Sequence, residues 1–267
     1  MGNSKRAMTT NKGLRVGLDR DKVLAATHGL QERYVLGNKT GLLEDAKKHL
    51  HRGFIVRVMM IQDAAVTLDV ELTKAKGPLD SHTAVRLSTL LNSFYLNLAG
   101  SLDNLAWALA YQYNLRPGLN ERENKHRHFI GLLKKEFTEA LRASGKIDLV
   151  THVLQFEGWY DDLRTFRDPG AHRIPLFVPR SIYSEDDVAE QKRLDSEAAK
   201  HFSDDRDEDG RAAMHAMFEL GAFHPVFIAE VPQIQIYNAG PKVTKDFEQW
   251  HALSEFVLAD GFGLGKL

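Results

Sequence analysis

The chain has 267 residues, of which 43% are hydrophobic and 27% are charged, with a formal net charge of -1. These values are ordinary for a folded soluble protein with a sizeable core, in one large domain or two small ones. Because the net charge is near zero, any nucleic-acid or membrane contact must come from a local patch. The absence of cysteine excludes disulfides, thiolate catalysis and cysteine-ligated metal sites.

The first 40 residues form an N-terminal extension with few structural signals. Residues 1–12 are polar and lack the apolar core of a signal peptide. One short helix is expected in 13–40, with Asp19 as its N-cap. No run of about 18 apolar residues occurs, so we expect no membrane-spanning helix. We therefore predict a cytoplasmic protein with no membrane partner.

Two long stripes of apolar residues follow, each spaced by three and four residues as in amphipathic helices. The first stripe consists of Leu50, Phe54, Val58, Ile61, Ala65, Leu68 and Leu72. The second consists of Leu87, Leu91, Phe94, Leu98, Leu102, Leu105 and Leu109. Gly77-Pro78 ends the first helix, and 116–118 ends the second. Helices of roughly 30 residues would each be about 45 Å long, which favours a helical bundle.

Shorter helices are predicted over 127–143, from Asp148 to Leu163, and over 243–259. Pro169-Gly170 is expected to break the helix that begins near Asp148. Between them, 174–179 reads as extended, and 183–212 is charged enough for a solvated helix or a mobile loop. The β-branched and aromatic content of 223–237 predicts one or two strands that could pair with 174–178. The fold class is therefore mainly α. The bundle comprises 41–173 plus 241–267, and a small β-containing insertion spans 174–240.

The residues that favour chemistry lie at the end of the helix that begins near Asp148. Arg167 continues the apolar stripe of that helix, so its guanidinium needs an anionic partner or a route to solvent. Asp168 before Pro169 resembles an N-cap followed by a proline at the first helical position. We therefore expect a short turn that brings His172 back near Arg167. Arginine binds phosphate oxygens and histidine exchanges protons near neutral pH, so the pair suits RNA cleavage without a metal.

This segment resembles the Arg-x4-6-His motif of the HEPN (higher eukaryotes and prokaryotes nucleotide-binding) superfamily. The spacer between Arg167 and His172 has four residues, and the polar Asp168 directly follows the arginine. The helix that contains 101–107 also resembles the helix that precedes the motif in such proteins. The resemblance covers about 41–173 plus the last helix, and it implies an all-α, HEPN-like bundle.

The resemblance further implies a two-fold homodimer in which both motifs meet in one cleft. Many members are metal-independent endoribonucleases of toxin–antitoxin or phage-defence systems, which implies an antitoxin partner. Others are non-catalytic modules that bind RNA, a nucleotide or a protein partner. By this resemblance His172 transfers the proton, Arg167 binds the phosphate and Asp168 orients one of them. No cofactor or metal is expected. The Pro169-Gly170 pair departs from the pattern because it disfavours a continuous helical motif.

Other polar residues extend the predicted site. Arg164 and Arg173 would add to a local RNA-binding patch around the motif. Asn97, Ser101 and Asn104 form a polar line at i, i+4 and i+7. Asn104 and its neighbour Asp103 would then support the Arg167–His172 site. Alternatively, the polar line faces solvent or is a hydrogen-bonded seam between helices.

Simpler explanations stay open for each of these features. An arginine at a helix C-terminus often complements the helix dipole, and a histidine in a turn often binds a carbonyl. Two Glu-x-x-His pairs, at 123–126 and 248–251, have the spacing of di-iron bundles, but the first lies in a wholly polar segment. The acidic tract 204–209 would bind a basic partner or form a solvated loop.

Overall fold

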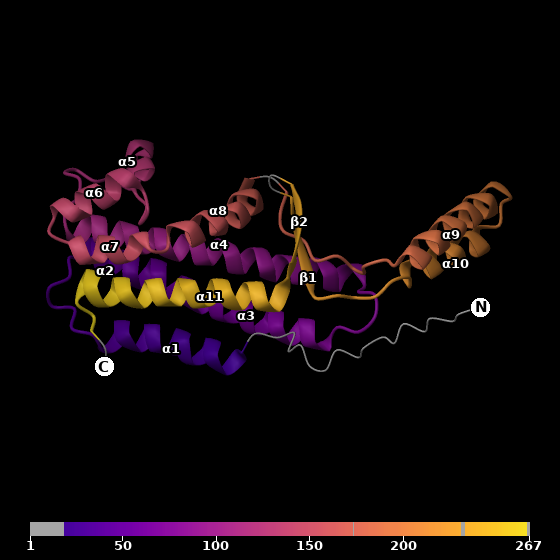
Figure 1. Cartoon of the computed structure of the whole chain (residues 1–267), viewed down its shortest axis with the longest axis horizontal. Helices are drawn as coiled ribbons and strands as arrows, with labels where there is room; N and C mark the ends of the chain where they lie inside the picture. The colour runs from indigo at the N-terminus through magenta and orange to yellow at the C-terminus, as the bar shows by residue number, and fades with distance from the viewer. Residues whose placement is uncertain (1–18, 173, 231–232, 266–267) are drawn as a thin grey trace, which may run out of the picture.

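The computed structural model describes residues 19–172, 174–230 and 233–265. Four helices run along the length of the molecule (Figure 1) and build its core: α1 (Arg20–Leu36), α3 (Val56–Lys74), α4 (Ser81–Gln112) and α11 (Ala239–Phe256). Helix α3 packs against both α1 and α4, and α11 contacts α1 and α4. A two-stranded antiparallel sheet is the one sheet of the described residues. The prediction of a mainly α protein with a small β insertion is confirmed.

The short helix expected in the N-terminal extension is α1. The side chain of Asp19 accepts a hydrogen bond from the backbone N–H of Lys22 at 3.2 Å, which confirms the predicted N-cap. Val23 and Leu30 are buried in the main core. This part of residues 1–40 therefore packs against the bundle.

Both predicted long helices are present. The first comprises α2 (Glu44–Lys48), the π-helical segment η1 (His49–Ile55) and α3. The second is α4, whose N-cap Asp80 accepts from the backbone N–H of Thr83 at 2.9 Å. All seven apolar residues of each predicted stripe are buried, because a repeat of three and four residues places them on one helix face.

The predicted helix over 127–143 is wrong in one respect, since it is two helices, α5 (Asn124–Phe129) and α6 (Lys135–Ala143). Ile130 and Leu132 between them are both buried. Residues two apart lie on opposite sides of a helix, so the chain leaves the helix to bury both. The helix predicted from Asp148 is likewise divided into α7 (Ile147–Leu154) and α8 (Glu157–His172). The final helix is α11 followed by the π-helical η2 (Val257–Gly261).

The insertion contains strands β1 (Val226–Glu230) and β2 (Ile234–Asn238), in register with Ile228 opposite Ile236. Phe177 exchanges backbone hydrogen bonds with Ile228 at 3.2 and 2.9 Å. The predicted pairing of 174–178 with the strands is therefore confirmed. The segment 175–178 lies between β1 and α4.

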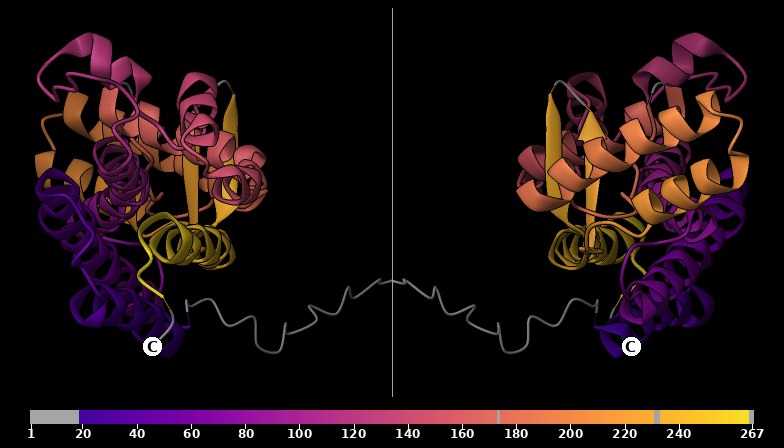
Figure 2. Two further views of the ribbon diagram at one scale, coloured as in Figure 1. Left: turned by 90° about the vertical axis from the view of Figure 1, so that its left-hand side faces the viewer. Right: turned by 90° about the vertical axis from the view of Figure 1, so that its right-hand side faces the viewer.

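The charged segment forms a helical hairpin of α9 (Glu185–Ser203) and α10 (Asp207–Phe218) that projects from one end of the bundle (Figure 1). The view onto that end shows the two helices side by side (Figure 2). Leu194, Ala198 and Ala213 form its own small hydrophobic cluster. The acidic tract supplies the turn at Asp205 and the first turn of α10, where negative charge is favourable beside the helix N-terminus.

An aromatic cluster joins α8 to the bundle and to the sheet. The Phe166 ring lies 4.9 Å from Tyr95, 5.8 Å from Phe227 and 5.2 Å from Tyr237, measured between ring centroids. Leu163, one turn earlier on α8, is also fully buried. Packing of these two side chains fixes the rotation of α8 and hence the direction in which the following residue, Arg167, projects.

Candidate functional site

Helix α8 continues further than the sequence predicted. We expected Pro169-Gly170 to break it and to fold the chain back, but the backbone stays helical to His172. Proline removes one hydrogen bond of the ladder, the one to the carbonyl of Thr165. Only three helical residues follow it, and Leu163 and Phe166 anchor the preceding turns in the core. The loss of that single bond near the C-terminus therefore does not end the helix.

Arg167 lies on α8 opposite Asp103 of α4. Its Nη2 is 3.8 Å from Oδ2 of Asp103, and its Nε is 3.5 Å from Oδ1 of Asp168. Arg164, one turn earlier, has Nη2 4.0 Å from Oδ2 of Asp168 and Nη1 4.0 Å from Oδ1 of Asp161. The side chains of Arg167 and Asp103 are 34% and 37% exposed. These are loose ion pairs open to solvent, in which an anion can compete for the guanidinium groups.

Several charged groups act on the carboxyl group of Asp103. Burial raises the pKa of Asp103, and the charges of Arg167, Lys134 and Arg57 oppose that rise. Burial lowers the pKa of Lys134, in the connection between α5 and α6, and Arg164 and Arg167 lower it further. Two arginines and a lysine therefore lie close enough to act on one another around a single partly desolvated carboxyl group.

Tyr160 belongs to the same site. Burial, followed by the charge of Asp103, raises the pKa of the Tyr160 phenol to about 12. Tyr160 precedes Arg167 by seven residues, which are two helical turns of α8. The phenol stays protonated at neutral pH, so it can donate a hydrogen bond to an anion but cannot act as a base.

Two of the predicted site residues are outside the described part of the site. The backbone of His172 is in α8, but its side chain and the whole of Arg173 lie outside the described residues. On a helix, positions 167 and 172 are separated by about 140° around the axis and about 7.5 Å along it. The helical backbone therefore does not bring His172 back over Arg167 in the way the predicted turn would have done.

Asn104 has a different partner from the one predicted. Its Oδ1 accepts a hydrogen bond from Nε of Arg57 at 3.1 Å, and Asn97 Oδ1 accepts from Nη1 of Arg57 at 2.9 Å. The hydroxyl of Ser101 accepts from Nε1 of Trp250 at 2.7 Å. The polar line is thus a hydrogen-bonded seam between helices, and Asp103 is the residue of this part of α4 that contacts Arg167.

Sequence reasoning missed Lys134, Tyr160 and Arg57 as members of this region. Lys134 lies between two short helices that the periodicity merged into one. Tyr160 falls in the apolar repeat of its helix, so the sequence assigns it to the core. The one sign of Arg57 is Gly100 on the facing helix, because a Cβ at position 100 would lie 2.5 Å from Cζ of Arg57. A glycine facing an arginine on the next helix is a signal that appears only once the two helices are paired.

The residues of the two Glu-x-x-His pairs have other partners. Glu123 pairs with Lys125 at 2.8 Å, and His126 accepts from the backbone N–H of Asn120 at 2.8 Å. Glu248 pairs with Lys22. In the part of the chain that the structure describes, no group of three or more His, Asp or Glu side chains could hold a metal ion. None of the described helices combines the length and the apolar character needed to cross a membrane.

No protein-family model matches the chain, and neither the curated proteins nor the solved structures give a significant match. The resemblance to HEPN proteins therefore depends on the sequence features alone, chiefly the spacing of Arg167 and His172.

Proposed function

We propose that this protein is a HEPN-type module that binds RNA, with Arg167, Arg164 and Lys134 as phosphate-binding groups. This proposal is supported by the position of the three cations around Asp103. They lie close enough together that the two arginines lower the pKa of Lys134. A phosphate group entering between them would relieve their mutual repulsion and receive charge-assisted hydrogen bonds. Loose ion pairs of 3.5 to 4.0 Å leave the guanidinium groups free to exchange partners.

Metal-independent RNA cleavage is a second candidate, favoured by the raised pKa of Asp103 beside Arg167. A carboxylate of raised pKa is a better proton acceptor for the ribose 2′-hydroxyl. Arg167 would stabilise charge on the phosphorane, and His172 would protonate the leaving oxygen. Because positions 167 and 172 face different sides of α8, the resemblance to HEPN dimers suggests that His172 acts beside Arg167 of a second copy.

Binding is tested by fluorescence anisotropy with full-length protein, a labelled single-stranded RNA and several salt concentrations. Arg167→Ala should weaken binding at least about tenfold and reduce the salt dependence of the affinity, because a phosphate contact is lost. Arg193→Ala is the matched control, because Arg193 is an exposed arginine that pairs with Glu190 and Glu197 on α9. Equal affinity of Arg167→Ala and the wild type would refute the proposed site.

Cleavage is tested on the same complexes with a chelator present. Turnover should leave a 2′,3′-cyclic phosphate and be lost in both His172→Ala and Asp103→Asn. Binding without turnover over a long incubation would leave the RNA-binding proposal standing and reject the nuclease. Analytical ultracentrifugation tests the homodimer, and co-purification with the product of an adjacent gene tests an antitoxin partner.

A further inference from the structure

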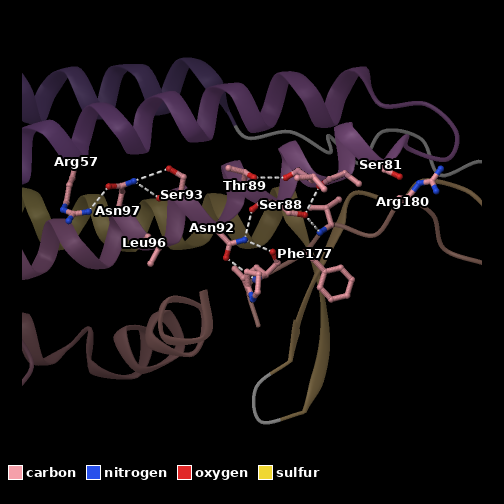
Figure 3. A pocket seen from close by; sticks show the side chains of 15 residues that line it. Arg57, Ser81, Ser88, Thr89, Asn92, Ser93, Leu96, Asn97, Phe177 and Arg180 are labelled. Carbon is pink, nitrogen blue, oxygen red and sulfur yellow. Dashed lines mark hydrogen bonds between the residues drawn. The ribbon is translucent and has the colours of Figure 1, made fainter. Parts of the chain in front are cut away.

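A groove of about 880 Å³ runs between the N-terminal half of α4 and the extended segment 175–180 (Figure 3). Its size is in the range of small-molecule sites. The apolar side chains that line it come from both walls: Ala84, Val85, Leu96, Pro175, Phe177 and Val178. Val85 is 66% exposed at the groove, so folding alone leaves it in water.

Most polar groups of the groove walls are already engaged. Arg180, at the Ser81 end, donates from Nε to the carbonyl of Leu79 at 2.6 Å, and its guanidinium carbon lies 4.9 Å from the centroid of the Phe218 ring. The side chain of Asn92 accepts from the backbone N–H of Leu176 at 3.1 Å and donates to the carbonyl of the same residue at 2.6 Å. The hydroxyl of Ser88 accepts from the N–H of Val178 at 2.9 Å. The hydroxyls of Ser88 and Thr89 each donate to the carbonyl four residues earlier in α4. The groove therefore presents mainly carbon to a ligand.

Arg57 is at one end of this groove. Its guanidinium donates to Asn97 and Asn104, which are both neutral, and it forms no salt bridge with any described residue. Its charge acts on Asp103 only through space. A guanidinium carries five N–H donors, so donors are left for a ligand. A half-buried cation with neutral partners at the end of an apolar groove is complementary to an anion attached to an apolar chain.

We propose that this groove binds a long-chain carboxylic acid, with its carboxylate on Arg57 and its alkyl chain along α4 toward Ser81. A carboxylate matches the fork of guanidinium donors. The distance along α4 from position 97 to position 81 is about 24 Å at 1.5 Å per residue, which accommodates an extended acyl chain. The groove does not include Arg167, so this proposal and the RNA-binding proposal can fail separately.

Isothermal titration calorimetry of the full chain with hexadecanoate, below its micelle concentration, tests the site. We expect saturable 1:1 binding, and octanoate should bind more weakly because fewer methylene groups are buried. Hexadecanoic acid methyl ester should bind at least about tenfold more weakly, because it lacks the charge that pairs with Arg57. Arg57→Gln should have the same effect on hexadecanoate, while Arg57→Lys should retain part of the affinity.

Val85→Asp tests the groove without disturbing the folded structure, because the Val85 side chain is 66% exposed. It should weaken hexadecanoate binding at least about tenfold by placing a charge beside the alkyl chain. Val35→Asp, at a 62% exposed valine of α1 outside the groove, is the matched control and should leave the affinity unchanged. The proposal is overturned if hexadecanoate does not bind, if the ester binds equally well, or if the two valine variants behave alike. A ligand-free dimer that Val85→Asp dissociates would instead assign the groove to a second copy.

Discussion

Removing the buried carboxylate of Asp246 tests how the helices are held together. Its carboxylate is 1% exposed, and it receives three donors. They are Nζ of Lys242 at 2.8 Å, the hydroxyl of Tyr95 at 2.8 Å and Nε1 of Trp159 at 3.2 Å. These groups come from α11, α4 and α8, so a single carboxylate joins three helices. Burial and the charge of Asp246 raise the pKa of Tyr95 well above its ordinary value.

Asp246→Ala would leave the Tyr95 hydroxyl buried and unpaired, and would leave the Lys242 ammonium without its counter-charge. Removing one partner of a buried ion pair costs about 3–5 kcal/mol. The side chain of Lys242 is 16% exposed and can turn partly to water, so we expect the lower end, about 3 kcal/mol. This is a large share of the roughly 5–15 kcal/mol by which domains are stable.

Urea denaturation followed by circular dichroism measures this loss of unfolding free energy. With a slope of about 3 kcal/mol per molar urea, the midpoint should fall by about 1 M. Asp161→Ala is the control, because this 69% exposed carboxylate only approaches Arg164 at 4.0 Å, and its removal should cost less than about 0.5 kcal/mol. A cost below about 1 kcal/mol for Asp246→Ala, or one equal to the control, would refute the role assigned to the buried network.

Three further predictions concern other parts of the bundle. Burial lowers the pKa of His49 below 6.5, so the unfolded chain binds its proton first as the pH falls. The unfolding free energy should therefore be smaller at about pH 5.5 than at about pH 7.5, and His49→Gln should reduce that difference; an unchanged difference would contradict this cause. Gly100→Ala should lower the melting temperature, because the new Cβ would lie 2.5 Å from Cζ of Arg57 and would displace this guanidinium from its hydrogen bonds to Asn97 and Asn104. Gly158→Ala, with open space around it, should raise stability by up to about 1 kcal/mol through helix propensity, and the opposite order of the two variants would be inconsistent with the packing described. Asn92→Ala should speed amide hydrogen exchange at Leu176, whose N–H loses its acceptor. Unaltered exchange at Leu176 would show that the extended segment 175–178 does not depend on its contact with α4.

The sequence alone was sufficient for the long helices and for the composition of the core. The stripes from Leu50 to Leu72 and from Leu87 to Leu109 are buried as their spacing predicts, because a helix converts a repeat of three and four residues into one apolar face. Asp19 as N-cap and the pairing of 174–178 with a later strand were also correct. These features depend on nearby residues or on composition, which a single sequence carries.

The end of α8 and the partners of the polar residues were decided by tertiary packing. The propensity of Pro169 predicted a break, but the burial of Leu163 and Phe166 against other elements keeps the preceding turns in place. Asn104 of α4 was expected beside Arg167 of α8 and instead binds Arg57 of α3, because positions 103 and 104 of α4 face different neighbouring helices and Asp103 is the one that meets Arg167. Local spacing says which residues share a face. Which residue of another helix meets that face depends on how the helices pack, and the local sequence does not contain that information.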